Sequence, residues 1–398
     1  MKRFLFIIGL LWLIGNLCAQ TSLEWHGFVN PHYYADSRSV LGGREDMMLF
    51  YPLPIVKDTF GRDINDGWQA NMLAITARLG LRISGPDMLG AKTSAYIEGD
   101  FTGSTNATIN NLRLRHAYID MDWGGRHRLL AGQYWYAMVI HEIMPMTNPL
   151  NMGAPFHCYA RQPQVRYEYH LHGFEAVAVA QWQLDNMSQG VLNGMPQSST
   201  LFARHSLVPE LNAQLRYRKG NLFVGAAANL KTIQSEVTTQ IISSPAFTTR
   251  AAKNDLHSSF SYSFFGKATL GSITIKAQTL LNNSLYEGCS LGGYLMLADS
   301  TFQDWHFNTV WLDIEHSKGH WHPGLFLGYA KNMDYGNVDF AHCFGRGHNI
   351  EYLWRVQPRL TYTTGNGLSF TGEAEYTFAG YSTPVGNLRL SLSMVYAF

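Results

Sequence analysis

Apolar side chains recur at every second position through most of this 398-residue chain, and this period of two constrains the fold more than any other feature. Successive side chains of a β-strand point to opposite faces, so the pattern predicts strands with one apolar and one polar face. The final segment shows the pattern most clearly. There, Arg389, Ser391, Ser393, Val395 and Ala397 alternate with Leu388, Leu390, Leu392, Met394, Tyr396 and Phe398.

Counting such segments predicts about sixteen antiparallel strands, each roughly 10–15 residues long, as a tilted membrane strand requires. They are residues 24–37, 70–84, 90–103, 111–122, 126–136, 161–171, 173–184, 207–218, 220–232, 254–268, 270–282, 304–317, 321–331, 348–363, 366–379 and 386–398. Leu291–Leu297 is either a further strand or a loop. Short connections alternate with long ones, which is typical of a closed barrel in an outer membrane. The predicted fold class is all-β: one transmembrane antiparallel β-barrel domain over residues 20–398.

Composition agrees with a barrel that presents an apolar band to lipid. Charged residues make up 15% of the chain, below the roughly 25% of soluble proteins, and aromatic residues make up 13%. The formal net charge is only +1, and no basic tail or patch is visible, so nucleic acid is not an expected partner.

The first nineteen residues have the features of a cleaved signal peptide. Two basic residues precede the apolar core 4–14, and Leu17-Cys18-Ala19 resembles a cleavage site. The apolar run is shorter than the ~20 residues of a membrane-spanning helix. A lipid anchor on Cys18 is the alternative, although Leu17 is bulky for that signal. The sequence therefore predicts export.

The polar face of the predicted strands carries most of the charge. It includes the candidate pore-lining residues Arg78, Arg82, Glu98, Asp100, Arg113, Arg115, Arg166, Arg355, Arg359, Glu373, Glu375 and Arg389, together with Glu168, Arg216, Arg218, Lys276 and Glu351. Eleven of these are basic and six are acidic, so the predicted lumen is mildly positive and favours anions. Alternatively, these charges pair across strands and only keep the wall hydrated and rigid.

The connection 137–160 is unusually apolar for a loop and contains three prolines. We expect it to fold into the barrel, pack on the wall and narrow the pore. Its polar candidates at this constriction are His141, Glu142, Asn148 and Asn151. The alternative is a contact between subunits.

Other chemistry finds little support in the sequence. The pairs His170-x-His172 and His320-x-His322 each offer two imidazoles, and two ligands do not make a metal site. Beyond the signal peptide, Cys158, Cys289 and Cys343 are widely spaced, and no G-x-S-x-G, Walker or dinucleotide motif is present. We therefore expect no metal, no cofactor and no enzymatic activity.

Five short motifs resemble the DcaP-like outer-membrane porins of Gram-negative bacteria. They are TARLGLRISGP at 76–86, YIEGDF at 96–101, LRLRHAY at 112–118, LAGQYW at 130–135 and RQPQVRY at 161–167. Together they cover roughly a quarter of the chain. The resemblance implies a sixteen-stranded trimeric porin with a constriction loop after the fifth strand, which by position is 137–160. It also implies a preference for small, often anionic, organic solutes.

The expected function is therefore passive diffusion of small polar, mainly anionic, solutes across the outer membrane. The expected partners are outer-membrane lipid, two further copies in a homotrimer, and the barrel-assembly machinery, which would recognise the terminal aromatic Phe398. Two alternatives remain open: a non-conducting barrel used in adhesion or assembly, and a barrel lipase, which would need a lipid-facing Ser–His pair.

Overall fold

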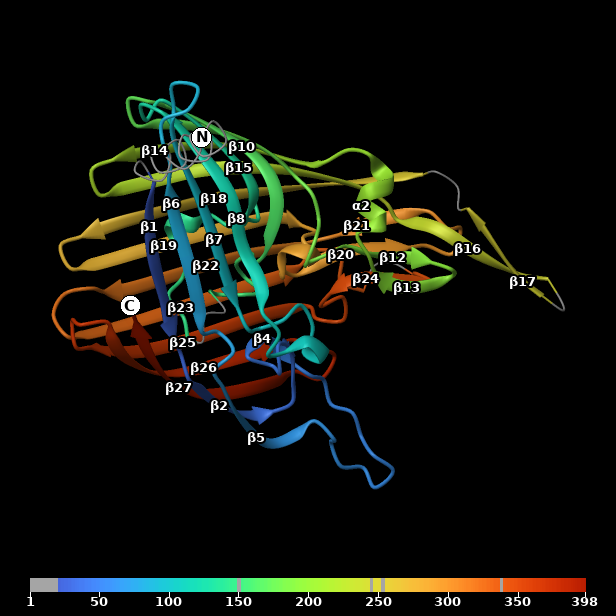
Figure 1. The fold of residues 1–398 in the computed structure, drawn as a ribbon. Coiled ribbons are helices and arrows are strands. Elements are labelled where there is room, and N and C mark those ends of the chain that lie inside the picture. Colours follow the sequence, from blue (N-terminus) through green and yellow to red (C-terminus); the bar gives the residue numbers. More distant parts are fainter. Residues whose placement is uncertain (1–20, 149–151, 244–245, 252–254, 337–338) are drawn as a thin grey trace, which may run out of the picture.

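The computed structural model describes residues 21–148, 152–243, 246–251, 255–336 and 339–398, and it confirms the closed antiparallel barrel (Figure 1). The main sheet has eighteen segments. Four of them form only two wall strands, each made of two successive segments, so the wall has sixteen strands. Two wall strands are β1 (Ser22–Val29) with β2 (His32–Arg38), and β5 (Asp66–Leu73) with β6 (Arg78–Ser84). The others are β7 (Lys92–Asp100), β8 (Arg113–Trp123), β9 (His127–Trp135), β10 (Arg161–Leu171), β11 (Phe174–Gln181), β14 (Glu210–Lys219), β15 (Leu222–Gln234), β18 (Leu256–Leu270), β19 (Ile273–Asn283), β22 (Phe307–His316), β23 (Trp321–Asn332), β25 (Tyr352–Thr363), β26 (Leu368–Ala379) and β27 (Val385–Ala397).

Each wall strand pairs with its neighbour in sequence, and the last strand closes the ring on the first. Strand β27 pairs with β2 along Ser393↔His32 to Arg389↔Asp36, and with β1 at Ala397↔Phe28. Beyond the end of β27, Gly27 and Phe398 exchange both backbone hydrogen bonds, at 2.9 and 3.0 Å. The described strands of the main sheet therefore leave no open edge, which is how a barrel satisfies its backbone in lipid.

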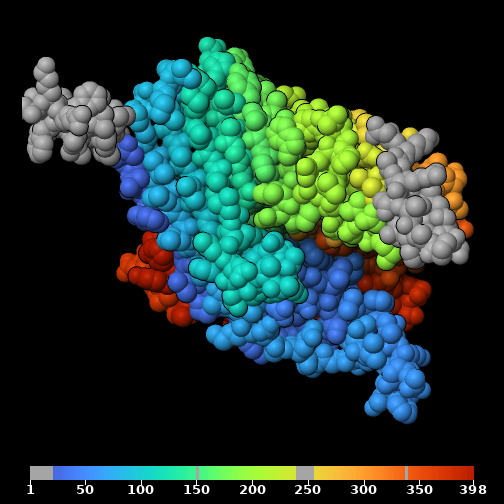
Figure 2. Space-filling view, turned by 45° about the vertical axis from the view of Figure 1, so that its right-hand side comes forward, coloured from blue at the N-terminus to red at the C-terminus, as the bar shows by residue number. Residues whose placement is uncertain are grey.

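The two faces of the wall differ as the alternation predicts. In β27, Leu392 is 63% exposed and points outward, whereas its neighbour Ser391 is 3% exposed and points inward. Figure 2 shows part of the outer surface, where successive wall strands lie side by side. No helix within the described ranges is long and apolar enough to span a membrane.

Two local irregularities reverse the face that simple alternation assigns. The second wall strand is interrupted between β5 and β6, and Ile75 turns inward, where it is 5% exposed and packs with Tyr34 and Met47. Alternation through Leu73, Ile75 and Leu79 predicts that Ile75 faces outward, and this prediction is wrong. In β8 a register shift opposite Glu98/Gly99 adds one residue. Tyr118, which the alternation placed outward, consequently faces inward.

Short turns and long loops lie at opposite ends of the barrel (Figure 1). The short-turn end also holds Phe398. The long loops contain four small elements near the wall, β3 (Val40–Gly43), β4 (Met48–Pro52), η1 (Asn106–Thr108) and η2 (His141–Ile143). Farther along the chain they contain β12 (Gln189–Leu192), β13 (Met195–Ser198), α2 (Leu201–Ser206), β16 (Glu236–Ser243), β17 (Ala246–Ala251), η3 (Tyr286–Gly288), β20 (Gly292–Met296), β21 (Phe302–Trp305) and β24 (His342–Arg346). The segment Leu291–Leu297 thus contains a short strand, β20, which pairs with β21 and β24 outside the wall.

Candidate functional site

The segment 136–160, between β9 and β10, leaves the wall and crosses the barrel interior. In the first half of the segment, Glu142 pairs with Arg216 of β14 at 3.0 Å, and the Met144 carbonyl accepts a hydrogen bond from Lys276 of β19 at 3.1 Å. Farther along, the Asn148 backbone N–H donates to Glu373 of β26 at 3.1 Å. These strands are separated from one another by other wall strands around the ring, so the segment contacts well-separated parts of the wall.

The returning half of the segment is fixed to the same side of the barrel. Arg355 donates from Nη1 to the Ala154 carbonyl at 2.8 Å. The ring of Phe156 lies 6.2 Å from that of Phe326, and a Cβ added to Gly328 would come within 2.7 Å of the Phe156 ring. A glycine at position 328 therefore leaves the space that the Phe156 ring occupies.

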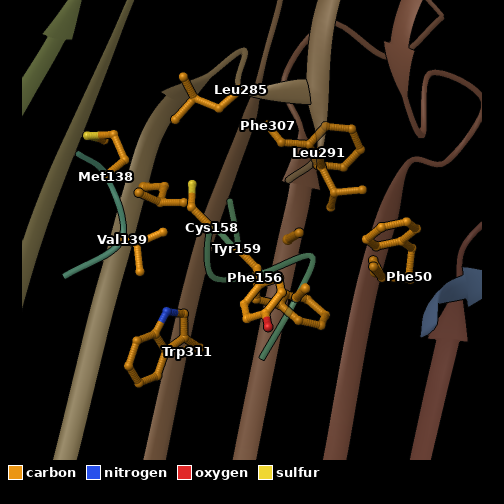
Figure 3. Packing of buried hydrophobic residues seen from close by; sticks show 14 of the residues in the cluster. Phe50, Met138, Val139, Phe156, Cys158, Tyr159, Leu285, Leu291, Phe307 and Trp311 are labelled. Carbon is orange, nitrogen blue, oxygen red and sulfur yellow. The ribbon is translucent and has the colours of Figure 1, made fainter. Parts of the chain in front are cut away.

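An apolar cluster packs around the segment inside the barrel (Figure 3). Met138, Val139 and Phe156 of the segment join Trp311 of the wall and Phe50 of β4. Burial of such side chains contributes about 1.5–3 kcal/mol each. The cluster therefore holds the segment in place by the same force that holds the core of a soluble protein.

Two cavities are lined by this segment and the wall. One, of about 200 Å³, lies toward the long-loop end and is lined by Gly42, Arg44, Phe50 and Tyr159 among others. The second, of about 510 Å³, includes Pro145, Met146 and His316, the last of these near the short-turn end. The segment therefore contributes to the boundary of both cavities: the upper cavity, toward the long-loop end, and the lower cavity, toward the short-turn end.

The predicted inward charges near the upper cavity form one ion-pair network. Arg115 is 1% exposed and lies 2.6 Å from Glu98 and 2.7 Å from Asp100. Arg113 lies 2.9 Å from Asp100, and Arg78 lies 3.6 Å from Glu98. The two carboxylates thus serve three guanidinium groups on neighbouring strands.

The remaining predicted wall arginines are also paired, with one exception. The pairs are Arg166–Glu168 at 2.5 Å, Arg355–Glu375 at 3.0 Å, Arg359–Asp313 at 2.6 Å and Arg389–Asp36 at 2.7 Å. The exception, Arg82, lies over the ring of Tyr96 at 5.3 Å. For most of the named arginines, pairing across the wall is therefore what the contacts show.

Sequence reasoning missed two of these acidic partners, Asp36 and Asp313. Asp313 and Glu315 alternate with Leu312 and Ile314 on β22, so the period of two would have found them. Asp36 lies inward near the end of β2, beside a register shift in the pairing of β2 with β5. These acids make the lumen less positive than the sequence count implied.

The predicted polar residues of the loop take different positions. Glu142 pairs with Arg216, and Asn148 also donates from Nδ2 to Ser391 at 3.1 Å. His141 is exposed on η2, with its ring 6.5 Å from that of Trp135. Asn151 lies outside the described residues.

Three further arginines at the upper cavity have no carboxylate within 4.0 Å in the described ranges: Arg44, Arg161 and Arg346. Arg161 lies 4.0 Å above the ring of Trp135 and donates to the Tyr159 hydroxyl at 3.2 Å. Arg346 lies 4.1 Å above the ring of Phe50 and donates to the Ser290 carbonyl at 2.8 Å. Loop positions have no alternation, so no pattern in the sequence marks Arg44 and Arg346.

These positive charges act on the one phenol that lines the upper cavity. Burial by itself would raise the pKa of Tyr159, but the guanidinium groups of Arg161, Arg115 and Arg78 outweigh burial and lower that pKa to about 7. A lowered pKa is the direction that several nearby positive charges produce for a phenol.

No metal-binding group of three or more His, Cys, Asp or Glu occurs among the residues that the structure describes. His320 and His322 instead contact the carbonyl oxygens of Thr363 and Gly319, at 2.8 and 2.9 Å. Cys158, Cys289 and Cys343 are free thiols.

No family model and no curated protein matches the sequence. Among solved structures, the fold is similar to the outer membrane channel DcaP of Acinetobacter baumannii, with a TM-score of 0.69 and 18% identity over 96% of this chain and 98% of that one. An anion-selective porin from Comamonas acidovorans matches with a TM-score of 0.57 and 10% identity over 95% and 100%. The trimer form of OmpT, an outer membrane protein of Vibrio cholerae, has the same TM-score and identity over the same shares. Similarity at these identities establishes the fold.

Proposed function

Because the chain has the fold of outer-membrane channels and porins, we propose that it is a porin for passive diffusion of small polar solutes, with anions preferred. The observation that carries this proposal is the closed sixteen-stranded wall, apolar outside and charged inside, with one segment crossing the lumen. A polar interior gives solutes a hydrated path across the membrane, whereas the lipid bilayer itself offers none. The proposal assigns transport and no catalytic step.

The preference for anions rests on particular arginines rather than on the total charge. Arg44, Arg161 and Arg346 have no carboxylate within 4.0 Å in the described part of the chain, so their charge remains available to a passing solute. Fixed positive charge in a narrow, low-dielectric passage lowers the barrier for anions and raises it for cations.

The proposal includes a place and an assembly. Residues 1–19 would direct export, and the apolar outer wall would contact outer-membrane lipid in a Gram-negative cell. Phe398, the aromatic C-terminal residue, would be the signal read by the barrel-assembly machinery. A homotrimer is supported by the trimer form of the similar OmpT.

Planar-bilayer recording tests the proposal. We expect stepwise conductance from purified protein, and a reversal potential in a salt gradient that shows anion preference. Arg161→Gln should shift the reversal potential toward cations, because it removes a charge that no carboxylate neutralises. The matched control is Arg62→Gln, whose side chain is 77% exposed on a long loop and lies 3.3 Å from Asp58.

Absence of conductance would contradict the porin and favour a closed barrel used in adhesion or assembly. Conductance with no preference for anions would retain the porin and contradict only the selectivity.

A further inference from the structure

The upper cavity concentrates arginine to a degree that wall hydration does not require. Six arginines line it, contributed by the β3–β4 turn, β6, β8, β10 and β24: Arg44, Arg78, Arg113, Arg115, Arg161 and Arg346. Asp100 is the one carboxylate among its described lining residues, and Glu98 lies behind Arg115. Six positive charges against two negative ones leave an excess of four.

Several guanidinium nitrogens at this cavity are buried without a hydrogen-bond partner. They are Arg44 Nε, Arg115 Nη2 and Arg161 Nε. Arg115 is 1% and Arg161 is 5% exposed. Buried charged donors without acceptors are costly. Three of them around one cavity indicate a missing acceptor that carries several oxygens.

The donors reach the cavity from different elements of the fold. Arg44 approaches from a long-loop turn, Arg161 from the start of β10, and Arg78 and Arg115 from the wall. A carboxylate offers two oxygens in a single plane. A phosphate group presents three acceptor oxygens in different directions and carries close to two negative charges. Two linked phosphate groups would match both the arrangement of donors and the charge excess.

We propose that the upper cavity is a binding site for small phosphate-bearing polyanions, with two phosphate groups as the best fit. This inference rests on the proposed function, since the same arginines favour anions in transit, but it adds residence at a defined site. Bound there, the ligand would join the β3–β4 turn and β24 to the wall through Arg44, Arg346 and Arg115. It would also obstruct the path past Tyr159.

Current block by inorganic pyrophosphate tests the site in planar bilayers. We expect pyrophosphate to reduce the open-channel current of the full-length protein at lower concentrations than inorganic phosphate or succinate. Arg161→Gln and Arg346→Gln should each weaken the block roughly tenfold or more, because a charge-assisted hydrogen bond is lost. Arg62→Gln, which removes the same charge on a long loop outside the cavity and the wall, should leave the block unchanged.

Equal block of the wild type and both cavity variants overturns the site, and block by succinate as strong as that by pyrophosphate overturns its phosphate preference. Heat-modifiable migration on gels checks that each variant folds, and Arg44→Gln, on a turn outside the wall, replaces any variant that does not. Conductance without pyrophosphate block contradicts the site but not the porin. If the protein does not conduct, calorimetric titration with pyrophosphate in detergent decides on the site alone.

Discussion

Buried arginines of the wall depend on particular carboxylates, and Arg389 is the clearest case. Its Nε and Nη2 lie 2.9 and 2.7 Å from the two oxygens of Asp36, and Nη1 donates to the Met47 carbonyl at 3.0 Å. Both side chains of the pair are 1% exposed or less. Such a pair is neutral as a unit, but each member is costly without the other.

Arg389→Met should therefore destabilise the barrel by about 3–5 kcal/mol, because the Asp36 carboxylate would stay buried without its counter-charge. Urea unfolding in lipid vesicles measures this loss. In contrast, Arg218→Met removes an arginine whose side chain is 43% exposed and should cost about 0–1 kcal/mol. Equal losses in the two variants would show that the buried pair has no special role.

At the long-loop end, His306 lies between two carboxylates. Its Nδ1 is 3.2 Å from Asp334 and its Nε2 is 3.6 Å from Asp304. The interaction with the Asp304 carboxylate raises the pKa of His306, burial opposes the rise, and the charge of Asp334 and its hydrogen bond to Nδ1 add to it. A raised pKa means that the imidazole of His306 binds its proton more tightly in the folded protein than in the unfolded chain.

The contribution of protonated His306 to the stability of the folded loops should be complete below the unfolded pKa of about 6.5. It should be lost as the pH rises through the higher pKa of the folded state. Hydrogen exchange of residues 332–336, corrected for intrinsic rates, should show more protection at about pH 5.5 than at about pH 8.5. His306→Gln should remove the difference. An unchanged difference in that variant would assign the effect to another group.

At the residue scale, the sequence predicted which wall residues face inward but not what neutralises them. Alternation is a local property: Arg355 and Arg389 are each 1% exposed, whereas their neighbours Val356 and Leu390 are 38% and 45% exposed. The partner of Arg389 is Asp36, more than 350 positions away, and only closure of the ring brings the two together. Arg44 and Arg346 lie in loops, where no period exists to assign a face.

Among the elements, the segment 136–160 behaves more like a core helix or strand than like a surface loop. Phe156 is fully buried, and its ring packs against Phe326 and the space left by Gly328. The segment is also anchored at both ends of its path by side chains of the wall. The apolar composition that marked it in the sequence therefore corresponds to real packing.

Phe156→Ala should destabilise the protein by about 3–5 kcal/mol, as is usual for a buried aromatic residue. It should also raise single-channel conductance, because the segment loses its main apolar contact with β23. Phe370→Ala is the matched control, since that ring is 43% exposed on the outer face. Lower stability with unchanged conductance would show that the segment does not limit the current.

Irregular elements are where sequence prediction failed for physical reasons. The interruption before β6 and the bulge in β8 each shift the alternation by one position, and so Ile75 and Tyr118 were assigned to the wrong face. Neither break carries a proline or glycine at the shifted residue to announce it. The extra strands in the long loops, such as β20, pair only with other loops and leave no amphipathic pattern.

For the whole molecule, the strand number and the order of pairing were predictable because a barrel repeats one simple rule. Every wall strand must alternate, and every neighbour in sequence is a neighbour in space. The arrangement of charge within the lumen was less predictable, because acids such as Asp313 offset much of the expected positive excess. What remains of that excess is local, at the upper cavity.

The joining of Gly27 to Phe398 has a consequence for biogenesis. The first wall strand gains its second neighbour only when β27 is present. A product truncated before β27 would therefore expose two unpaired strand edges, which favour aggregation. Quality control of this protein can therefore act on a single property, whether the first and last wall strands are paired.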